Sequence, residues 1–322
     1  MSDRSLDLKR RLRDGETVFG AWLSISDPVV AEIMATSGFD YVLIDTEHAP
    51  FSLQALQTAL MTFKGERTVP IVRVPWNDQV YIKQALDVGA DGILAPMVRT
   101  VEEAQALLRA CRYPPAGIRG FGPRRASNYH RNIDEYVAHA NDSLFVMPQI
   151  EDVRTVDSLD DIIGLGVDAL CIGPNDLSGS AGLLRQHDHP TVKGAIDRLL
   201  AIAKRRGVAV CTGITLPSDK QAEWIAAGAR MALLTSDVEF SRKGLRGPSN
   251  PWIACGLNTE PDNPDSRNER WGGPCAAPSR FFLGQGGAPE RVQMRTVRQN
   301  ASLVASSPPR SPRRRDRRFS AP

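Results

Sequence analysis

The stretch YVLIDTEHAPFSLQALQTALMTFKG, residues 41–65, combines a short apolar run, a polar break and a segment of helical periodicity. Residues 41–45 are mostly apolar without alternation, which is typical of a strand buried on both faces. Residues 52–65 repeat apolar side chains at helical spacing and end in glycine, which favours the end of a helix. The stretch therefore predicts one strand followed by one helix. It also raises the question of why a buried strand should end in Asp45, Glu47 and His48.

The same alternation of strand and helix recurs along most of the chain. Strands are expected at residues 17–24, 41–45, 70–74, 92–98, 144–150, 168–173, 208–213 and 231–236. Helical segments lie between them, for example at residues 52–65, 78–89, 101–112, 191–207 and 218–228. Eight such units in about 220 residues fit a closed (β/α)8 TIM barrel of the α/β class. An open doubly wound sheet is the weaker alternative, and no GxGxxG fingerprint follows the first strand.

Composition limits the class of protein. The chain has 322 residues, 42% of them hydrophobic, which is enough for a large core. No segment approaches the roughly 18 consecutive apolar residues of a membrane span, and the charged N-terminus lacks the apolar run of a signal peptide. A cytoplasmic protein is therefore expected. The five cysteines are odd in number and widely spaced, which suits reduced thiols better than a zinc site or a disulfide framework: Cys111, Cys171, Cys211, Cys255 and Cys275.

The last quarter of the chain differs from the rest. Residues 247–322 hold 12 of the 40 basic residues, 6 of the 37 acidic residues and 11 of the 23 prolines. They show no apolar periodicity that could bury a helix face. We therefore expect a barrel over residues 1–246 and a disordered tail rich in proline and arginine over residues 247–322. The RRRDRR run near the end is of a kind that is usually solvated, so a nucleic-acid partner is not expected.

Ionisable side chains gather where the expected strands end. In a (β/α)8 barrel the loops after the strands carry the chemistry. These positions hold Asp45, Glu47 and His48 after the second strand, Arg73 in the third, Gln149 and Glu151 at the fifth, and Asp176 after the sixth. Their convergence on one rim indicates a functional site, which is a first answer to the question posed by residues 41–50.

Each of these residues also has a structural explanation. An aspartate after a strand is often a helix N-cap, which would account for Asp176. Arg73 could pair with a carboxylate of the barrel, and a single histidine such as His48 is more often a hydrogen-bonded structural residue. Glu151 is harder to explain in this way, because a buried carboxylate is costly without a metal or cation beside it.

Glu151 and Asp176, with Gln149 nearby, predict an oxygen-rich metal site that lacks a full set of ligands. Mg²⁺ or Mn²⁺, with Co²⁺ as a further candidate, would complete its coordination with water or substrate oxygens. A 2-oxo acid offers two such oxygens. The cation would then polarise the keto group while Arg73 stabilises the developing enolate. No lysine falls at a strand end, so the Schiff-base route is disfavoured.

Five segments in combination resemble the HpcH/HpaI aldolase family of metal-dependent aldolases. They are residues 19–52, 72–98, 117–123 (GIRGFGP), 148–152 (PQIED) and 171–182 (CIGPNDLSGSAG). The resemblance implies reversible aldol cleavage of a 4-hydroxy-2-oxo acid into pyruvate and an aldehyde. It also implies a homo-oligomer, usually a hexamer in this family. Relatives continue the final helix and use it between subunits, and this chain departs from that pattern.

The resemblance also implies roles for the metal and pyruvate residues. Glu151 and Asp176 would hold the divalent metal, and Gln149 and Arg73 would contact the pyruvate part. Backbone amides around Gly173, which precedes Pro174, would receive the pyruvate carboxylate.

The proton-transferring residues are implied in the same way. His48 is similar to the acid/base residue of the family, and Asp45 would lie close to it. Asp87 is similar to an acidic residue that the family presents to this histidine from a neighbouring subunit.

Two other functions stay open. A related lyase that cleaves an acyl-CoA thioester, of the citryl-CoA or malyl-CoA type, would use the same Glu, Asp and Arg arrangement, although a CoA-binding groove is not evident. A barrel without catalysis could instead act as a binding or assembly protein. Metal-dependent release of pyruvate would exclude that inert barrel.

Overall fold

Eight parallel strands close into a barrel, each paired with its neighbour in the sequence. The computed structural model describes residues 3–213 and 218–244. The strands are β1 (Val18–Leu23), β2 (Tyr41–Asp45), β3 (Val69–Arg73), β4 (Gly92–Ala95), β5 (Phe145–Ile150), β6 (Ala169–Ile172), β7 (Ala209–Cys211) and β8 (Met231–Ser236). Because β8 pairs with β1, the sheet has no open edge, and the predicted (β/α)8 barrel is confirmed. The predicted tail, residues 247–322, lies outside the described residues.

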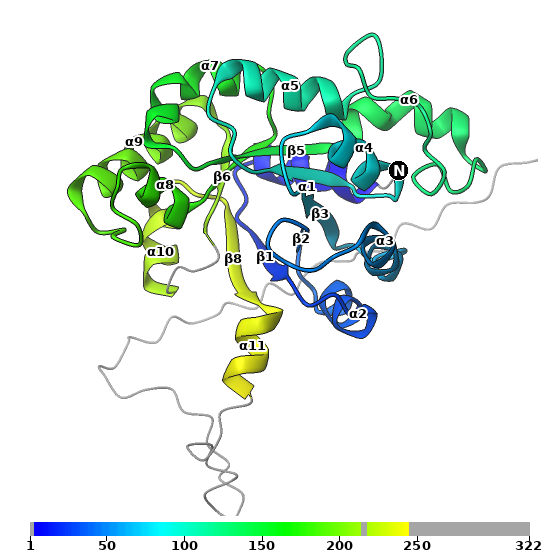
Figure 1. Cartoon of the computed structure of the whole chain (residues 1–322), viewed down its shortest axis with the longest axis horizontal. Helices are drawn as coiled ribbons and strands as arrows, with labels where there is room; N and C mark the ends of the chain where they lie inside the picture. The colour runs from blue at the N-terminus through cyan, green and yellow to red at the C-terminus, as the bar shows by residue number, and fades with distance from the viewer. Residues whose placement is uncertain (1–2, 214–217, 245–322) are drawn as a thin grey trace, which may run out of the picture. The chain divides into compact units, whose positions relative to one another are not determined.

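Helices surround the strands, as Figure 1 shows. They are α1 (Asp3–Arg13), α2 (Pro28–Thr36), α3 (Leu53–Thr62), α4 (Gln79–Asp87), α5 (Val101–Cys111), α6 (Ile133–Ser143), α7 (Leu159–Gly164), α8 (Pro174–Ser180), α9 (Pro190–Arg206), α10 (Ser218–Ala227) and α11 (Asp237–Gly244), with a 3-10 helix η1 (Val153–Ser158). Local sequence explains their ends. Ser52 caps α3 by accepting a hydrogen bond from the Ala55 N–H at 3.1 Å, and Gly207 ends α9 in the left-handed region with φ of 68°.

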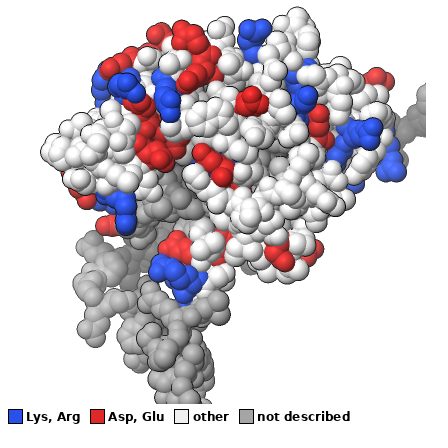
Figure 2. Space-filling model, viewed as in Figure 1, with Lys and Arg blue, Asp and Glu red and all other residues white. Residues whose placement is uncertain are grey.

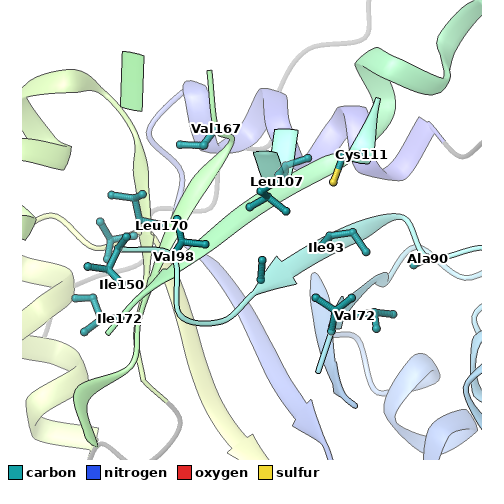
Figure 3. Close-up of a cluster of buried hydrophobic side chains, with 14 of the residues drawn as sticks. Val72, Ala90, Ile93, Val98, Leu107, Cys111, Ile150, Val167, Leu170 and Ile172 are labelled. Carbon is teal, nitrogen blue, oxygen red and sulfur yellow. The ribbon is translucent and has the colours of Figure 1, made fainter. Parts of the chain in front are cut away.

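Side chains of each strand alternate between two apolar layers. Outward residues such as Ile93 of β4 and Leu170 of β6 meet helix residues such as Leu107 of α5 in the outer layer, part of which Figure 3 shows. Inward residues such as Phe145 and Met147 fill the barrel itself. This alternation of period two decides which side chains can reach a site inside the barrel mouth.

Helix α1 contributes to the inner layer, and the sequence did not predict it. Leu8 and Leu12 are buried with the inward strand residues, while the last turn of α1 is rich in arginine. Ser5 donates a hydrogen bond to the Ser143 carbonyl at the end of α6. The helix thus covers the N-terminal end of the barrel, opposite to the loops that follow the strands.

The last described helix is short, as expected. Helix α11 has eight residues and begins at Asp237, whose carboxylate accepts hydrogen bonds from the N–H groups of Ser24 and Ile25. Figure 1 shows it extending away from the end of β8. Phe240 on this helix is 75% exposed, and the strand residues Phe19 and Leu234 are also exposed.

Charged groups on the face drawn in Figure 2 include both signs near each other. Ion pairs link α9 to η1 and α7, for example Arg198 to Asp157 and Arg205 to Asp160, both at 2.6 Å. Such exposed pairs contribute little to stability. Among the described helices, none is both long and apolar enough to cross a membrane.

Candidate active site

The polar end of β2 lies at the mouth of the barrel. Asp45 follows Leu43 at the next inward position of β2, and Arg73 follows Ile71 in the same way on β3. The strand pairing places Asp45 and Arg73 side by side. The alternation that buries Leu43 and Ile71 in the barrel therefore points both charged side chains into its mouth. This explains why an apolar run ends in ionisable residues.

A cavity of about 400 Å³ opens at this end of the barrel. It is lined by Trp22, Asp45, His48, Arg73, Gln149, Cys171, Ile172, Gly173, Pro174, Asn175, Asp176 and Gly213. Seven of the predicted residues line it together, from loops or strand ends far apart in the sequence. If each residue had only a separate structural role, there would be no reason for all of them to line one cavity. No lysine is among these lining residues.

Arg73 is fixed by two carboxylates. Its Nε and Nη2 donate to Asp45 Oδ1 and Oδ2 at 3.0 and 2.7 Å, and its Nη1 lies 2.9 Å from Glu47 Oε2. The contact with Glu47 is an ion pair without hydrogen-bond geometry. Burial acts to raise the pKa of Asp45, but the hydrogen bonds from Arg73 and from the backbone of the following loop hold that pKa below its usual range. Arg73 does pair with a barrel carboxylate, and it also lines the cavity.

Trp22 is a site residue that the sequence did not reveal. It lies near the C-terminal end of β1 and belongs to the inner layer. The centroid of its ring is 4.5 Å from the guanidinium carbon of Arg73, and its indole N–H donates a hydrogen bond to Asp45 Oδ2 at 3.3 Å. The polar residues at the other strand ends drew attention to those strands. The only signal in the sequence is its position in the strand VFGAWL, where the alternation of side chains turns Trp22 towards the inside of the barrel.

Glu151 lies deep behind the cavity wall. It is 4% exposed, and its Oε2 accepts a hydrogen bond at 2.7 Å from the N–H of Met97, a residue in the left-handed region with φ of 56°. Burial raises the pKa of Glu151 to about 7; the Met97 N–H opposes this, and the negative charges of Asp176 and Glu47 add to it. Asp176 is therefore close enough to Glu151 to repel it.

Glu47 belongs to the same group of carboxylates. Burial raises its pKa to about 6 despite the attraction of Arg73, and the charges of Asp45 and Asp176 contribute to the rise. The negative charge of Asp176 thus disfavours the charged forms of both Glu47 and Glu151. A positive ion between them would remove that cost.

Gly173 makes room for this arrangement. A Cβ at this position would lie 2.6 Å from Cγ and Oε1 of Glu151 and 2.9 Å from Nε2 of Gln149. Any side chain would therefore displace the two residues expected to bind metal and pyruvate. The Oε1 atom of Gln149 is buried without a hydrogen-bond partner, so it is available to a ligand.

Asp176 is not a helix N-cap. Gly173 occupies the N-cap position of α8, and Asp176 sits in the first turn with its side chain at the cavity. The capping explanation does hold for Asp152, which accepts a hydrogen bond from the Arg154 N–H at the start of η1.

His48 lies at the exposed edge of the cavity. Its side chain is 70% exposed, and its Nε2 is 3.9 Å from Glu47 Oε2. The His48 N–H donates to Asp45 Oδ1 at 3.2 Å, so the loop that carries the histidine is tied to the Arg73 pair. Its imidazole remains free to meet a substrate at the mouth.

Asp87 is not brought to His48 within one chain. It ends α4, and helices run opposite to the strands, so this end lies towards the N-terminal face of the barrel. There Asp87 accepts a hydrogen bond from the buried Arg119 at 2.8 Å. The predicted contact with His48 of a neighbouring subunit remains a prediction.

The residues present fit a divalent cation. Glu151 and Asp176 supply hard oxygen ligands, the repulsion between carboxylates favours a positive charge, and Gln149, whose Oε1 has no hydrogen-bond partner, lines the same cavity as Asp176. Within the part of the chain that the structure describes, no cluster of three or more His, Cys, Asp or Glu side chains could hold a metal ion. The remaining ligands would therefore come from water and substrate, as is usual for Mg²⁺.

The comparison with protein families now decides the classification. The family described as HpcH/HpaI aldolase/citrate lyase matches residues 18–243. The chain belongs to this family. The matched region covers every strand of the barrel and all the candidate site residues.

Similar proteins share most of the described chain. Hydroxypyruvate/pyruvate aldolase from Roseobacter denitrificans is 40% identical over 234 residues, 71% of this chain and 90% of that protein. A 4-hydroxy-2-oxo-heptane-1,7-dioate aldolase from Escherichia coli is 39% identical over 242 residues, 72% and 91% of the two chains. The crystal structure of a family member from Burkholderia cenocepacia has a TM-score of 0.70 at 34% identity, covering 74% of this chain and 95% of that one.

These relationships support a pyruvate aldolase function, as the sequence predicted. The family as a whole is dependent on divalent metals. The aldolase relatives act on small molecules.

Proposed function

We propose that this chain is a metal-dependent aldolase that reversibly cleaves a 4-hydroxy-2-oxo acid into pyruvate and an aldehyde. One observation carries the proposal: Asp176 lines the cavity at the barrel mouth, and its negative charge adds to the burial that raises the pKa of both Glu47 and Glu151, beside a fixed arginine. A divalent cation, Mg²⁺, Mn²⁺ or Co²⁺, would supply Lewis acidity towards the 2-oxo group of the substrate.

In this proposal Glu151 and Asp176 hold the cation. Arg73 presents its guanidinium towards the oxygen on which negative charge develops, and the Asp45 pair keeps it in place before the substrate enters. Gln149 offers its unpaired oxygen and its amide N–H groups to the ligand side. The backbone at Gly173, next to Pro174, lies open to the substrate carboxylate.

His48 is the proposed acid/base. Its exposed imidazole stands where the aldehyde half of a substrate would leave the cavity, and it would take up the proton of the 4-hydroxyl in cleavage. Asp87 would meet it from a second copy of the chain, so we include a homo-oligomer in the proposal. The buried free thiols suit the reducing cytoplasm as its location.

The decisive experiment is a pyruvate assay on the full chain. Protein treated with a chelator should release no pyruvate from a 4-hydroxy-2-oxo acid, and added Mg²⁺, Mn²⁺ or Co²⁺ should restore release. Glu151→Gln should abolish the restoration while the far-ultraviolet circular dichroism stays that of the parent. Glu32→Gln, an exposed glutamate on α2, is the matched control and should behave as the parent. Full turnover in chelator, or by Glu151→Gln, would contradict the proposal.

The alternative lyase acting on an acyl-CoA thioester is tested in the same assay. Citryl-CoA and malyl-CoA replace the hydroxy-oxo acid, and turnover of either without pyruvate release from the hydroxy-oxo acids would favour that alternative. Absence of turnover with every substrate and metal would favour the inert barrel.

A further inference from the structure

Two cysteines face each other inside the barrel, directly beneath the candidate site. Cys171 of β6 and Cys211 of β7 are register partners in adjacent parallel strands. Both belong to the inward layer, and they are 2% and 0% exposed. Neither is used by the proposed chemistry.

The spacing of the two residues suits a disulfide. Neighbouring strands lie about 4.8 Å apart, so the two Cα atoms fall within the roughly 4.4–6.8 Å found for disulfides. Inward side chains of a closed barrel converge on its axis, which brings their Cβ atoms closer together than their Cα atoms. Disulfides need Cβ atoms about 3.5–4.5 Å apart, and convergence moves this pair towards that range.

The two thiols belong to the same inner apolar layer. A hydrogen bond with Cys211 is the largest of the effects that raise the pKa of Cys171, followed by burial. Cys211 also lies 3.5 Å from the hydroxyl of Tyr41. As inward residues at paired positions of β6 and β7, the two side chains lie on the same face of the sheet, and each Sγ lies near the backbone carbonyl of the next residue, Ile172 at 3.9 Å and Thr212 at 3.6 Å.

A route from solvent to the pair exists. Cys171 lines the cavity of the candidate site, whereas Cys211 lies behind it. Gln149 of β5 is the register partner of Cys171 on its other side. A change at Cys171 would therefore alter the support of a residue proposed to bind substrate.

We propose that Cys171 and Cys211 form a reversible disulfide in the folded protein when a small two-electron oxidant, such as hydrogen peroxide, enters through the cavity, and that this bond weakens the site. The activity part rests on the proposed function, and the bond itself does not. The two can therefore fail separately.

The chemistry balances with peroxide alone. The Cys171 thiol loses its proton and its sulfur attacks one peroxide oxygen; the O–O bond breaks, and the other oxygen leaves as hydroxide and takes up that proton to become water, which gives a sulfenic acid. The Cys211 sulfur then attacks the sulfenic sulfur, an S–S bond forms, and the sulfenic oxygen leaves as a second water. Two thiols lose two electrons in total, and peroxide gains them. Because its raised pKa keeps the Cys171 thiol protonated at neutral pH, the reaction should be slower than that of free cysteine.

The test is peptide mapping of the native protein after exposure to hydrogen peroxide. Free thiols are alkylated, the protein is digested without reductant, and linked peptides are identified by mass spectrometry. We expect a Cys171–Cys211 linked peptide, lighter by two hydrogens than the reduced pair, which disappears on treatment with dithiothreitol. Glutathione disulfide, which is too large to reach a buried sulfur, should not produce it.

Cys111 is the internal control. It is equally buried, at 1% exposure, but lies on α5 in the outer layer and does not line the cavity. It should stay reduced throughout. A linked peptide that contains Cys111, Cys255 or Cys275 in place of the predicted pair, or a predicted link that forms only in denaturant, would overturn the proposal.

Two variants test the effect on the site. In the parent, metal-dependent pyruvate release should fall as the link forms and return with dithiothreitol. Cys211→Ala and Cys211→Ser should each lose the linked peptide and this thiol-reversible fall. If one of them does not fold, the other and the mapping of the parent still decide. A parent that becomes fully linked and keeps its activity would show that the bond does not weaken the site.

Discussion

Arg73 and Asp45 meet through two hydrogen bonds, from Nε to Oδ1 at 3.0 Å and from Nη2 to Oδ2 at 2.7 Å. Both side chains are buried at the mouth of the barrel, and Trp22 stacks on the guanidinium. The orientation of Arg73 is therefore fixed without a ligand. A preorganised cation of this kind stabilises developing negative charge without reorganisation during the reaction.

Arg73→Lys should reduce kcat/KM for pyruvate release by about 10²- to 10³-fold, because lysine cannot make the two-point contact with Asp45. Affinity for Mn²⁺, measured by calorimetry, should change little, since Arg73 is not a metal ligand. Arg10→Lys, which alters an exposed ion pair with Asp7, is the control and should leave kcat/KM unchanged. Loss of Mn²⁺ binding in Arg73→Lys would mean that the arginine acts on the metal site instead.

His48→Asn should slow cleavage by about 10²- to 10⁴-fold, the usual range for loss of a general acid or base. The side chain is 70% exposed, so the midpoint of urea denaturation should stay that of the parent. Steady-state kinetics together with a urea titration separate the two effects. A variant with unchanged kcat would remove His48 from the mechanism.

Gly173→Ala should weaken metal binding strongly while the protein still folds. The new Cβ would lie 2.6 Å from Glu151 Cγ, so the carboxylate has to move. Gly194→Ala, on the exposed face of α9 with no atom near the new Cβ, is the control and should be neutral or stabilising by about 0.5–1 kcal/mol. Calorimetric titration with Mn²⁺ measures the difference. Parent-like affinity in Gly173→Ala would place the metal elsewhere.

The stability of the metal-free protein should fall as the pH rises through the window set by Glu151. Its pKa of about 7 in the folded protein exceeds the ordinary 4.5, so the folded state keeps a proton that the unfolded chain has released. The stabilisation from that proton is complete below about pH 4.5 and is lost as the pH rises to about 7. The size of the effect is on the order of 3 kcal/mol.

The measurement compares the parent with Glu151→Gln by urea denaturation in chelator from acid to neutral pH. The variant lacks the titrating group, so the free energy of unfolding of the variant should increase relative to that of the parent as the pH rises. Parallel curves would contradict the assignment of this pKa. Metal affinity of the parent should increase over the same range, because the bound form of Glu151 is deprotonated.

The barrel was predictable because its strands have to be apolar on both faces. Residues 41–45 and 144–150 are almost entirely apolar, and the structure places β2 and β5 within these two runs. Helix α1 was not predicted, since its apolar contacts are few and lie among many charges: Leu8 and Leu12 fill the barrel end while arginines occupy the last turn. Its role depends on the shape of the finished barrel.

The candidate site was predictable where a charged residue interrupts an apolar strand. Asp45, Arg73 and Glu151 carry charges that are unfavourable to bury without partners, so their positions at strand ends indicated where such partners gather. Trp22 carries no such signal, because an aromatic residue in a strand is ordinary core. The hydrogen bond between Asp87 and Arg119 could not be derived either, since the periodicity of the chain does not show which loop residue meets the end of a helix.

Inside the barrel, the side chains change from charged or polar to apolar between two successive inward positions of a strand. Below Asp45, Arg73 and Gln149 lie Leu43, Ile71 and Met147, and the thiols of Cys171 and Cys211 belong to the same inner layer. A layer of alkyl groups, a thioether and buried thiols is far less polar than water, so electric fields from the charges above it are weakly screened on that side. Met147→Gln should therefore shift the titration of the carboxylates above it without touching them. The low polarity of this inner layer thus strengthens the electrostatic interactions among the charged groups at the barrel mouth.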